Sequence, residues 1–148
     1  MVKVNVYLNF AGGTEEAFAF YRSVFGGEIR EFRRFGDIPG MTGTPEELRR
    51  VMHIELPIGD QFVLMASDTP AADPVSGQGY RLHAGNNVYL SLHPDSQAEA
   101  RRVFDALSAG GVIESELVPM FWGSLYASFA DRFGVQWMID CPLTHPPQ

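Results

Sequence analysis

Hydrophobic and polar residues alternate along several short stretches of the chain, a pattern typical of strands with one buried face. In residues 2–10 the apolar positions are Val4, Val6, Leu8 and Phe10, and the polar face carries Asn5, Tyr7 and Asn9. The same alternation predicts further strands over 28–35, 51–58, 62–66, 87–92, 112–118, 124–129 and 135–139.

Two other stretches carry apolar residues at helical spacing. Residues 14–25 predict a helix with Thr14 as its N-cap, ended by the pair Gly26-Gly27. A second helix is predicted from Ser96 onward, because Ser96 and Glu99 have the spacing of a capping box and the apolar residues that follow recur at helical spacing as far as Leu107. Gly110-Gly111 ends that helix. Residues 36–47, rich in Gly, Pro and Thr, predict a loop.

The order of elements occurs twice, which is the main organisational signal. Each copy reads as a strand, a helix ending in Gly-Gly, and three more strands, and Tyr7-Leu8-Asn9-Phe10 corresponds to Tyr89-Leu90-Ser91-Leu92. We therefore predict an α+β fold, a single domain 1–148 of two tandem βαβββ modules. The halves span about 1–68 and 86–141, joined by a Pro/Gly-rich connection over 69–85. A curved mixed sheet built from them would surround a cup-shaped cavity.

The polar strand faces supply the candidate binding residues. They combine amides, phenols, one imidazole and one carboxylate, groups that can hydrogen-bond and stack a small organic ligand. The alternative is an ordinary solvent-exposed sheet face, where polar residues also belong. The candidate ligand-binding residues are Asn5, Tyr7, His53, Glu55, Asn87, Tyr89, Trp122, Gln136 and Met138.

The amino-acid composition limits the partners and the cellular location that we expect. The chain has 148 residues, 45% of them hydrophobic, and a net charge of -7, which argues against nucleic acid and against an anionic membrane surface as partners. No apolar stretch is long enough to span a bilayer. The single cysteine, Cys141, excludes an internal disulfide, so we expect a cytoplasmic location.

Several motifs together resemble a known family. They are Tyr7-Leu8-Asn9-Phe10, residues 20–27 (FYRSVFGG), residues 52–60 (MHIELPIGD), Phe121-Trp122-Gly123 and residues 133–137 (FGVQW). Over nearly the whole chain they resemble the vicinal-oxygen-chelate (glyoxalase/bleomycin-resistance/extradiol dioxygenase) superfamily, most closely its PhnB-like branch. One departure is Arg132, where the family usually has proline. The resemblance implies a homodimer.

The resemblance also implies where a metal would bind. By strand position the family's ligands fall on Asn5, Glu55, Asn87 and Met138, and only Glu55 suits a catalytic divalent metal. His53, two residues away on the same face, could add a second ligand, which is still too few. We therefore predict no cofactor, with a divalent metal held by Glu55 and His53 as the alternative.

These observations leave two functions open. The first is binding of a small organic molecule without a complete metal site. The second is a divalent-metal-dependent isomerase, lyase or dioxygenase of glyoxalase type, with His53 and Glu55 as catalytic candidates, acting either as an acid–base pair or as a structural pair. Methyl transfer lacks support, because Ala11-Gly12-Gly13 does not have the Gly spacing of a nucleotide-type site.

Overall fold

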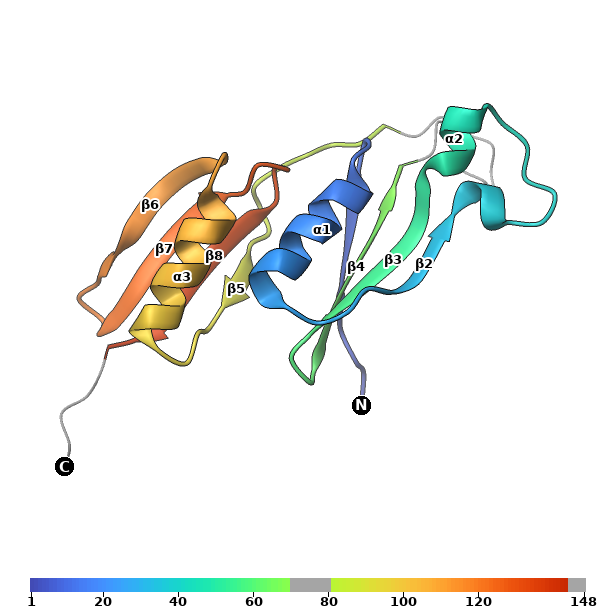
Figure 1. Cartoon of the computed structure of the whole chain (residues 1–148). Helices are drawn as coiled ribbons and strands as arrows, with labels where there is room; N and C mark the ends of the chain where they lie inside the picture. The colour runs from blue at the N-terminus through green and yellow to red at the C-terminus, as the bar shows by residue number, and fades with distance from the viewer. Residues whose placement is uncertain (70–80, 144–148) are drawn as a thin grey trace. The chain divides into compact units, whose positions relative to one another are not determined.

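The computed structural model describes residues 1–69 and 81–143, which fall into two compact units, Met1–His83 and Ala84–Gln148. Each unit contains one four-stranded mixed sheet with a long helix on one face (Figure 1). The predicted α+β class and the repeated βαβββ order are therefore confirmed. The cup-shaped cavity between the halves stays a prediction, and most of the predicted connection lies outside the described residues.

The first unit builds its sheet in the order β1-β4-β3-β2. The neighbours β1 and β4 run parallel, and the other pairs are antiparallel. Its elements are β1 (Val6–Phe10), α1 (Thr14–Phe25), β2 (Arg30–Arg34), the 3-10 turn η1 (Phe35–Asp37), α2 (Pro45–Arg49), β3 (Val51–Ile58) and β4 (Phe62–Asp68).

The second unit repeats this topology in the order β5-β8-β7-β6, again with one parallel pair, β5 and β8. Its elements are β5 (Leu90–Leu92), α3 (Gln97–Ser108), β6 (Val112–Pro119), β7 (Ser124–Ala130) and β8 (Gln136–Pro142). The two sheets therefore share one connectivity as well as one order of elements.

Each unit buries its core between the long helix and one sheet face. In the first unit Phe18 and Tyr21 of α1 are fully buried with Ile54 and Leu56 of β3. In the second unit, Phe104 of α3 meets Phe129 of β7 edge to face, with ring centroids 5.6 Å apart. Strand residues next to these core positions point away from the helix, because successive side chains alternate. We call the side away from the helix the polar face of each sheet.

The first and fifth strands are shorter than predicted. The strand β1 begins at Val6, not Val2, and β5 begins at Leu90, not Asn87. Both parallel ladders begin close to the start of the partner strand. Val6 lies opposite Leu64, near the start of β4, and Leu90 lies opposite Trp137, near the start of β8. The residues immediately before Val6 and Leu90 are not part of these ladders. Val4 and Val88, expected on the helix side, are therefore exposed.

Two further expectations about helices are wrong. The N-cap of α1 is Gly13, in the left-handed conformation, and Thr14 is the first helical residue. Residues 36–47 are not all loop, because α2 begins at Pro45 behind the cap Thr44, whose side chain accepts a hydrogen bond from the Glu47 amide. The Thr44–Glu47 capping box was a readable signal. None of the residues of α2 is buried, so hydrophobic periodicity could not reveal it.

Candidate functional site

Tyr7, His53 and Glu55 form a connected group on the polar face of the first sheet. The Tyr7 hydroxyl lies 3.2 Å from His53 Nδ1 and 3.5 Å from the Met52 carbonyl oxygen. The Tyr7 and His53 rings stack, with centroids 5.6 Å apart and an angle of 26° between their planes. On the other side of the imidazole, His53 Nε2 lies 3.8 Å from Glu55 Oε2. A phenol, an imidazole and a carboxylate therefore follow one another across two strands.

The spacing of this group leaves polar atoms open to a ligand. The 3.8 Å between Glu55 Oε2 and His53 Nε2 is longer than a hydrogen bond, so the Glu55 carboxylate does not accept a hydrogen bond from His53 in this geometry. The side chains of His53 and Glu55 are 25% and 17% exposed, and Tyr7 is 45% exposed. The group can accept and donate hydrogen bonds, and the stacked rings give a planar molecule a surface.

Asn5, at the entry to β1, has a structural role. Its side-chain oxygen accepts a hydrogen bond from the Val63 amide over 3.1 Å, which ties the chain before β1 to β4. Four positions further on, Asn9 Oδ1 accepts a hydrogen bond from the Ser67 hydroxyl over 3.4 Å. Of the four candidates in the first unit, Tyr7, His53 and Glu55 are thus in contact, and Asn5 is occupied by the backbone beside them.

In the second unit, Tyr89 is held by a residue that the sequence reasoning missed. Its hydroxyl donates to both oxygens of Glu114, over 2.8 and 2.9 Å. This hydrogen bond stabilises the neutral phenol beside a negative charge and raises the pKa of Tyr89 above its usual value. Glu114 is the extra residue of a bulge in β6, between Ile113 and Ser115. Strand alternation alone could not have placed it.

Gln136 and Met138 lie on the polar face of the second sheet. They alternate with the buried residues Trp137 and Ile139, as the sequence predicted. Gln136 Oε1 is buried and has no hydrogen-bond partner among the described residues, which costs about 1–3 kcal/mol when no donor reaches it. Met138 lies between Ser91 of β5 and Ser128 of β7.

The remaining candidates, Asn87 and Trp122, are exposed. The Trp122 ring packs edge to face on Tyr126, with centroids 5.6 Å apart, and stays 48% exposed. Its neighbour Phe121 is 97% exposed and meets the same indole. These side chains form an apolar edge of the second unit, and Asn87 lies before β5 in the chain.

The described residues supply too few donors for a catalytic metal ion. Within residues 1–69 and 81–143, no three His, Cys, Asp or Glu side chains lie close enough to hold an ion together. His53 and Glu55 supply two donors on one face, and a catalytic zinc or iron site ordinarily uses three. The residues of the first unit therefore do not complete a metal site.

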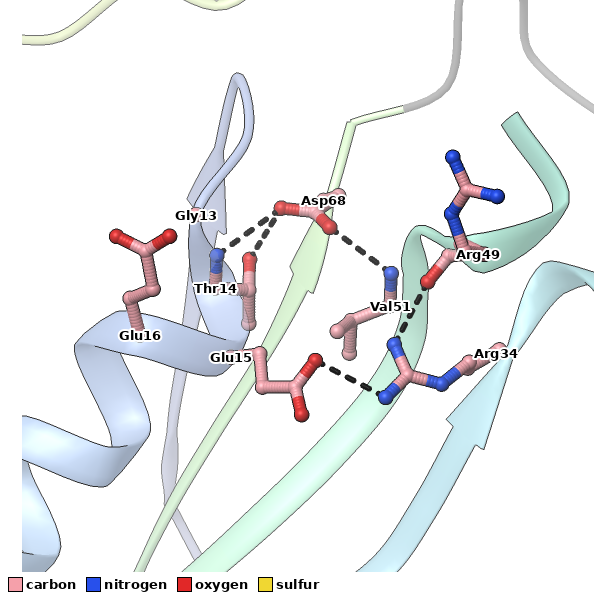
Figure 2. A pocket seen from close by; sticks show the side chains of 8 residues that line it. All are labelled: Gly13, Thr14, Glu15, Glu16, Arg34, Arg49, Val51 and Asp68. Carbon is pink, nitrogen blue, oxygen red and sulfur yellow. Dashed lines mark hydrogen bonds and ion pairs between the residues drawn. The ribbon is translucent and has the colours of Figure 1, made fainter. Parts of the chain in front are cut away.

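The first unit has a hollow of about 220 Å³ at the start of α1, which no sequence signal indicated. Figure 2 shows the side chains that line it. Asp68, only 4% exposed, accepts hydrogen bonds there from the Thr14 amide (3.2 Å), the Thr14 hydroxyl (2.7 Å) and the Val51 amide (2.8 Å). The hollow is lined by Gly13, Thr14, Glu15, Glu16, Arg34, Arg49, Val51 and Asp68.

Arg34 connects three elements around this hollow through hydrogen bonds. Its guanidinium donates to Glu15 over 3.0 Å and to the Arg49 carbonyl oxygen over 2.8 Å (Figure 2). These contacts join α1 to β2 and α2, just as Asp68 joins α1 to β3 and β4. Most polar groups that line the hollow thus form hydrogen bonds with one another, an arrangement that holds these elements together.

Comparison with known proteins identifies the family. The model of the Glyoxalase/Bleomycin resistance protein/Dioxygenase superfamily matches residues 3–139, almost the whole chain. The chain belongs to this superfamily. The recognition made from the motifs is therefore confirmed, and the two βαβββ units are the superfamily's fold in this chain.

Individual relatives agree with this assignment. The chain is 29% identical to protein YjdN of Escherichia coli (strain K12), over 96% of this chain and 97% of YjdN. It is 36% identical to protein PA1353 from Pseudomonas aeruginosa, whose crystal structure matches with a TM-score of 0.82 over 97% of this chain and all of that one. A PhnB protein from Bacillus cereus, also named as a 3-demethylubiquinone-9 3-methyltransferase, matches with a TM-score of 0.74 and 23% identity. It covers 95% of this chain and 99% of its own, and shows the fold alone.

The departure at Arg132 has a structural explanation. Arg132 Nε donates to the Ala109 carbonyl oxygen, just beyond the end of α3, over 3.1 Å. A guanidinium at a helix C-terminus is favoured by the negative end of the helix dipole. Arginine at this position thus closes the helix end, a contact that proline could not make.

Proposed function

We propose that the protein binds a small planar organic molecule on the polar face of its first sheet, using Tyr7, His53 and Glu55 and no complete metal site. The observation that carries the proposal is the chain of contacts through His53: 3.2 Å to the Tyr7 hydroxyl and 3.8 Å to Glu55. Stacked, partly exposed rings beside an open carboxylate suit a flat molecule that carries hydrogen-bond donors.

The alternative is a divalent-metal-dependent isomerase, lyase or dioxygenase. In its favour are only the two donors His53 and Glu55, since the family positions Asn5, Asn87 and Met138 are poor ligands for such metals. Asn5 is further engaged with the Val63 amide. Tight binding of one Zn²⁺, Ni²⁺ or Mn²⁺ per chain, lost in Glu55→Gln, would favour this alternative over the proposal.

The experiment uses 4-hydroxybenzamide, a neutral planar probe with N–H and O–H donors, and ligand-observed NMR. For ten heavy atoms we expect a dissociation constant of roughly a millimolar. His53→Gln removes the stacked ring and should weaken binding about tenfold, or ~1.4 kcal/mol. His93→Gln is the matched control, because His93 is exposed in the second unit, and should change affinity less than about twofold. Equal affinities in all three proteins would contradict the proposal.

We propose in addition a cytoplasmic location and a homodimer. The single cysteine fits a reducing compartment. Support for a dimer comes from apolar side chains left exposed in the second unit, notably Val112, Phe121 and Trp122. Light scattering should give twice the chain mass of 16.4 kDa, and Phe121→Ser should move the mass towards that of one chain. A mass of 16.4 kDa for the unaltered protein would exclude the dimer.

A further inference from the structure

Two arginines of β2, three positions apart, project to the same side of the first sheet. Arg30 lies opposite Glu55 of β3, and Arg33 lies opposite His53. Directly opposed residues of antiparallel strands share a face, so both guanidinium groups stand on the side of the candidate site. In a regular strand, residues three positions apart face opposite ways. The register shift between Arg30 and Arg33, an extra residue in β2, removes that alternation.

The backbone of the bulge is strained. Glu31 has a φ of 54°, the left-handed region, and among the described residues it is the one non-glycine with a positive φ. Strained residues of this kind persist where the surroundings hold them, and bulges often re-aim side chains beside binding sites. The strain at Glu31 is thus linked to the placement of Arg30 and Arg33.

The neighbour Arg34 gives an independent check of the direction. Its guanidinium donates to Glu15 of α1 over 3.0 Å, so Arg34 lies on the helix side of the sheet. The register shift between Arg33 and Arg34 has its extra residue, Met52, in β3, so β2 itself keeps its alternation there and Arg33 lies on the opposite side, with His53.

The guanidinium charges of Arg30 and Arg33 are only weakly paired with acidic side chains. Arg33 lies 3.6 Å from Glu31, and both side chains are more than half exposed. An exposed ion pair of this kind contributes little and gives way readily to a better-oriented anion. Arg30, which faces Glu55 across the strands, is exposed. The edge of the polar face therefore carries two accessible cations beside the stacked rings of Tyr7 and His53.

We propose that the ligand of this face is a planar organic acid whose carboxylate pairs with Arg30 and Arg33 while its ring lies against Tyr7 and His53. The inference rests on the proposed function and adds the chemical class of the ligand. Guanidinium groups bind carboxylates through two parallel hydrogen bonds, which fixes orientation as well as charge. Glu55 then receives a donor on the ring.

The test compares 4-hydroxybenzoate with 4-hydroxybenzamide, which share size and shape and differ in charge. We expect the unaltered protein to bind the acid at least about fivefold more tightly than the amide. Arg30→Gln and Arg33→Gln should each abolish that preference. Arg101→Gln is the matched control, because Arg101 is a similarly exposed arginine of α3 in the second unit, and it should keep the preference.

The outcomes separate the two proposals. If both probes bind equally, and neither arginine variant changes their ratio, the acid class is wrong while the binding site at His53 stands. If His53→Gln leaves the affinity of both probes unchanged, or neither probe binds, the proposed function fails and this inference fails with it.

Discussion

The Thr14 hydroxyl and Asp68 Oδ1 lie 2.7 Å apart, which joins the first residue of α1 to the last residue of β4 (Figure 2). The other oxygen of Asp68 accepts a hydrogen bond from the Val51 amide, at the start of β3. One buried carboxylate thus fastens a helix start and two strand ends, and it takes the place of the side-chain cap that Gly13 cannot provide.

Replacement of this carboxylate should therefore destabilise the first unit. Asp68→Ala leaves three donors without their acceptor and should cost about 3 kcal/mol of unfolding free energy. Asp60→Ala, at the exposed turn between β3 and β4, should cost no more than about 0.5 kcal/mol. Urea unfolding should be followed by circular dichroism, because both tryptophans, Trp122 and Trp137, lie in the second unit. Equal stability of the two variants would contradict the structural role of Asp68.

The strain at Glu31 predicts a stabilising substitution. A non-glycine residue in the left-handed region costs about 1–2 kcal/mol, and glycine loses about 0.5–1 kcal/mol more on ordering. Glu31→Gly should therefore raise the unfolding free energy by about 0.5–1 kcal/mol. Glu28→Gly, an exposed position without a positive φ, should give no gain. A loss of stability in Glu31→Gly would mean that the bulge does not adopt this backbone.

The hydrogen bond between Tyr89 and Glu114 predicts a change in titration. The bond to Glu114 raises the pKa of Tyr89 above the usual value of about 10, so Glu114→Gln should lower that pKa towards 10. Because the folded pKa is the higher one, the bond stabilises the fold below pH 10 and is lost as the pH rises through the folded pKa. Ultraviolet titration of the phenols, with Tyr89→Phe to assign the signal, measures it. Glu116→Gln, on the same strand, should leave the pKa unchanged.

The backbone around Gly111 leaves no room for a side chain at this position. A Cβ built there would lie 2.0 Å from the Ala130 carbonyl oxygen and 2.9 Å from the Asp131 backbone. Gly111→Ala should therefore force the turn between α3 and β6 away from the end of β7, at a cost of about 3 kcal/mol. Gly85→Ala, at an open position, should be tolerated. Thermal unfolding compares the two, and a melting temperature for Gly111→Ala close to that of Gly85→Ala would contradict the close approach.

The sequence predicted the elements that bury apolar residues, because burial produces a periodic hydrophobic pattern. An element that buries nothing has no such pattern and was missed. The helices α1 and α3 and the alternation around Trp137 could be predicted because in each unit the apolar residues face that unit's own core. The helix α2 buries nothing, and only its cap Thr44 marks it.

The candidate site was predictable only where the strands are regular. Tyr7, His53 and Glu55 follow strand alternation and were placed correctly on one face. Arg30 and Glu114 were not, because each owes its direction to a bulge that depends on the register with a neighbouring strand. The local sequence does not encode that register.

The central claim is that Tyr7, His53 and Glu55 bind a small planar molecule without a metal. The most direct test is a titration of chelator-treated protein, labelled with ¹³C in its histidine rings, with 4-hydroxybenzamide. We predict a saturable shift of the His53 ring signal, assigned with His53→Gln and unchanged by excess EDTA. A His53 shift that appears only after one equivalent of Zn²⁺, Ni²⁺ or Mn²⁺ is added, and is lost in Glu55→Gln, would contradict the claim.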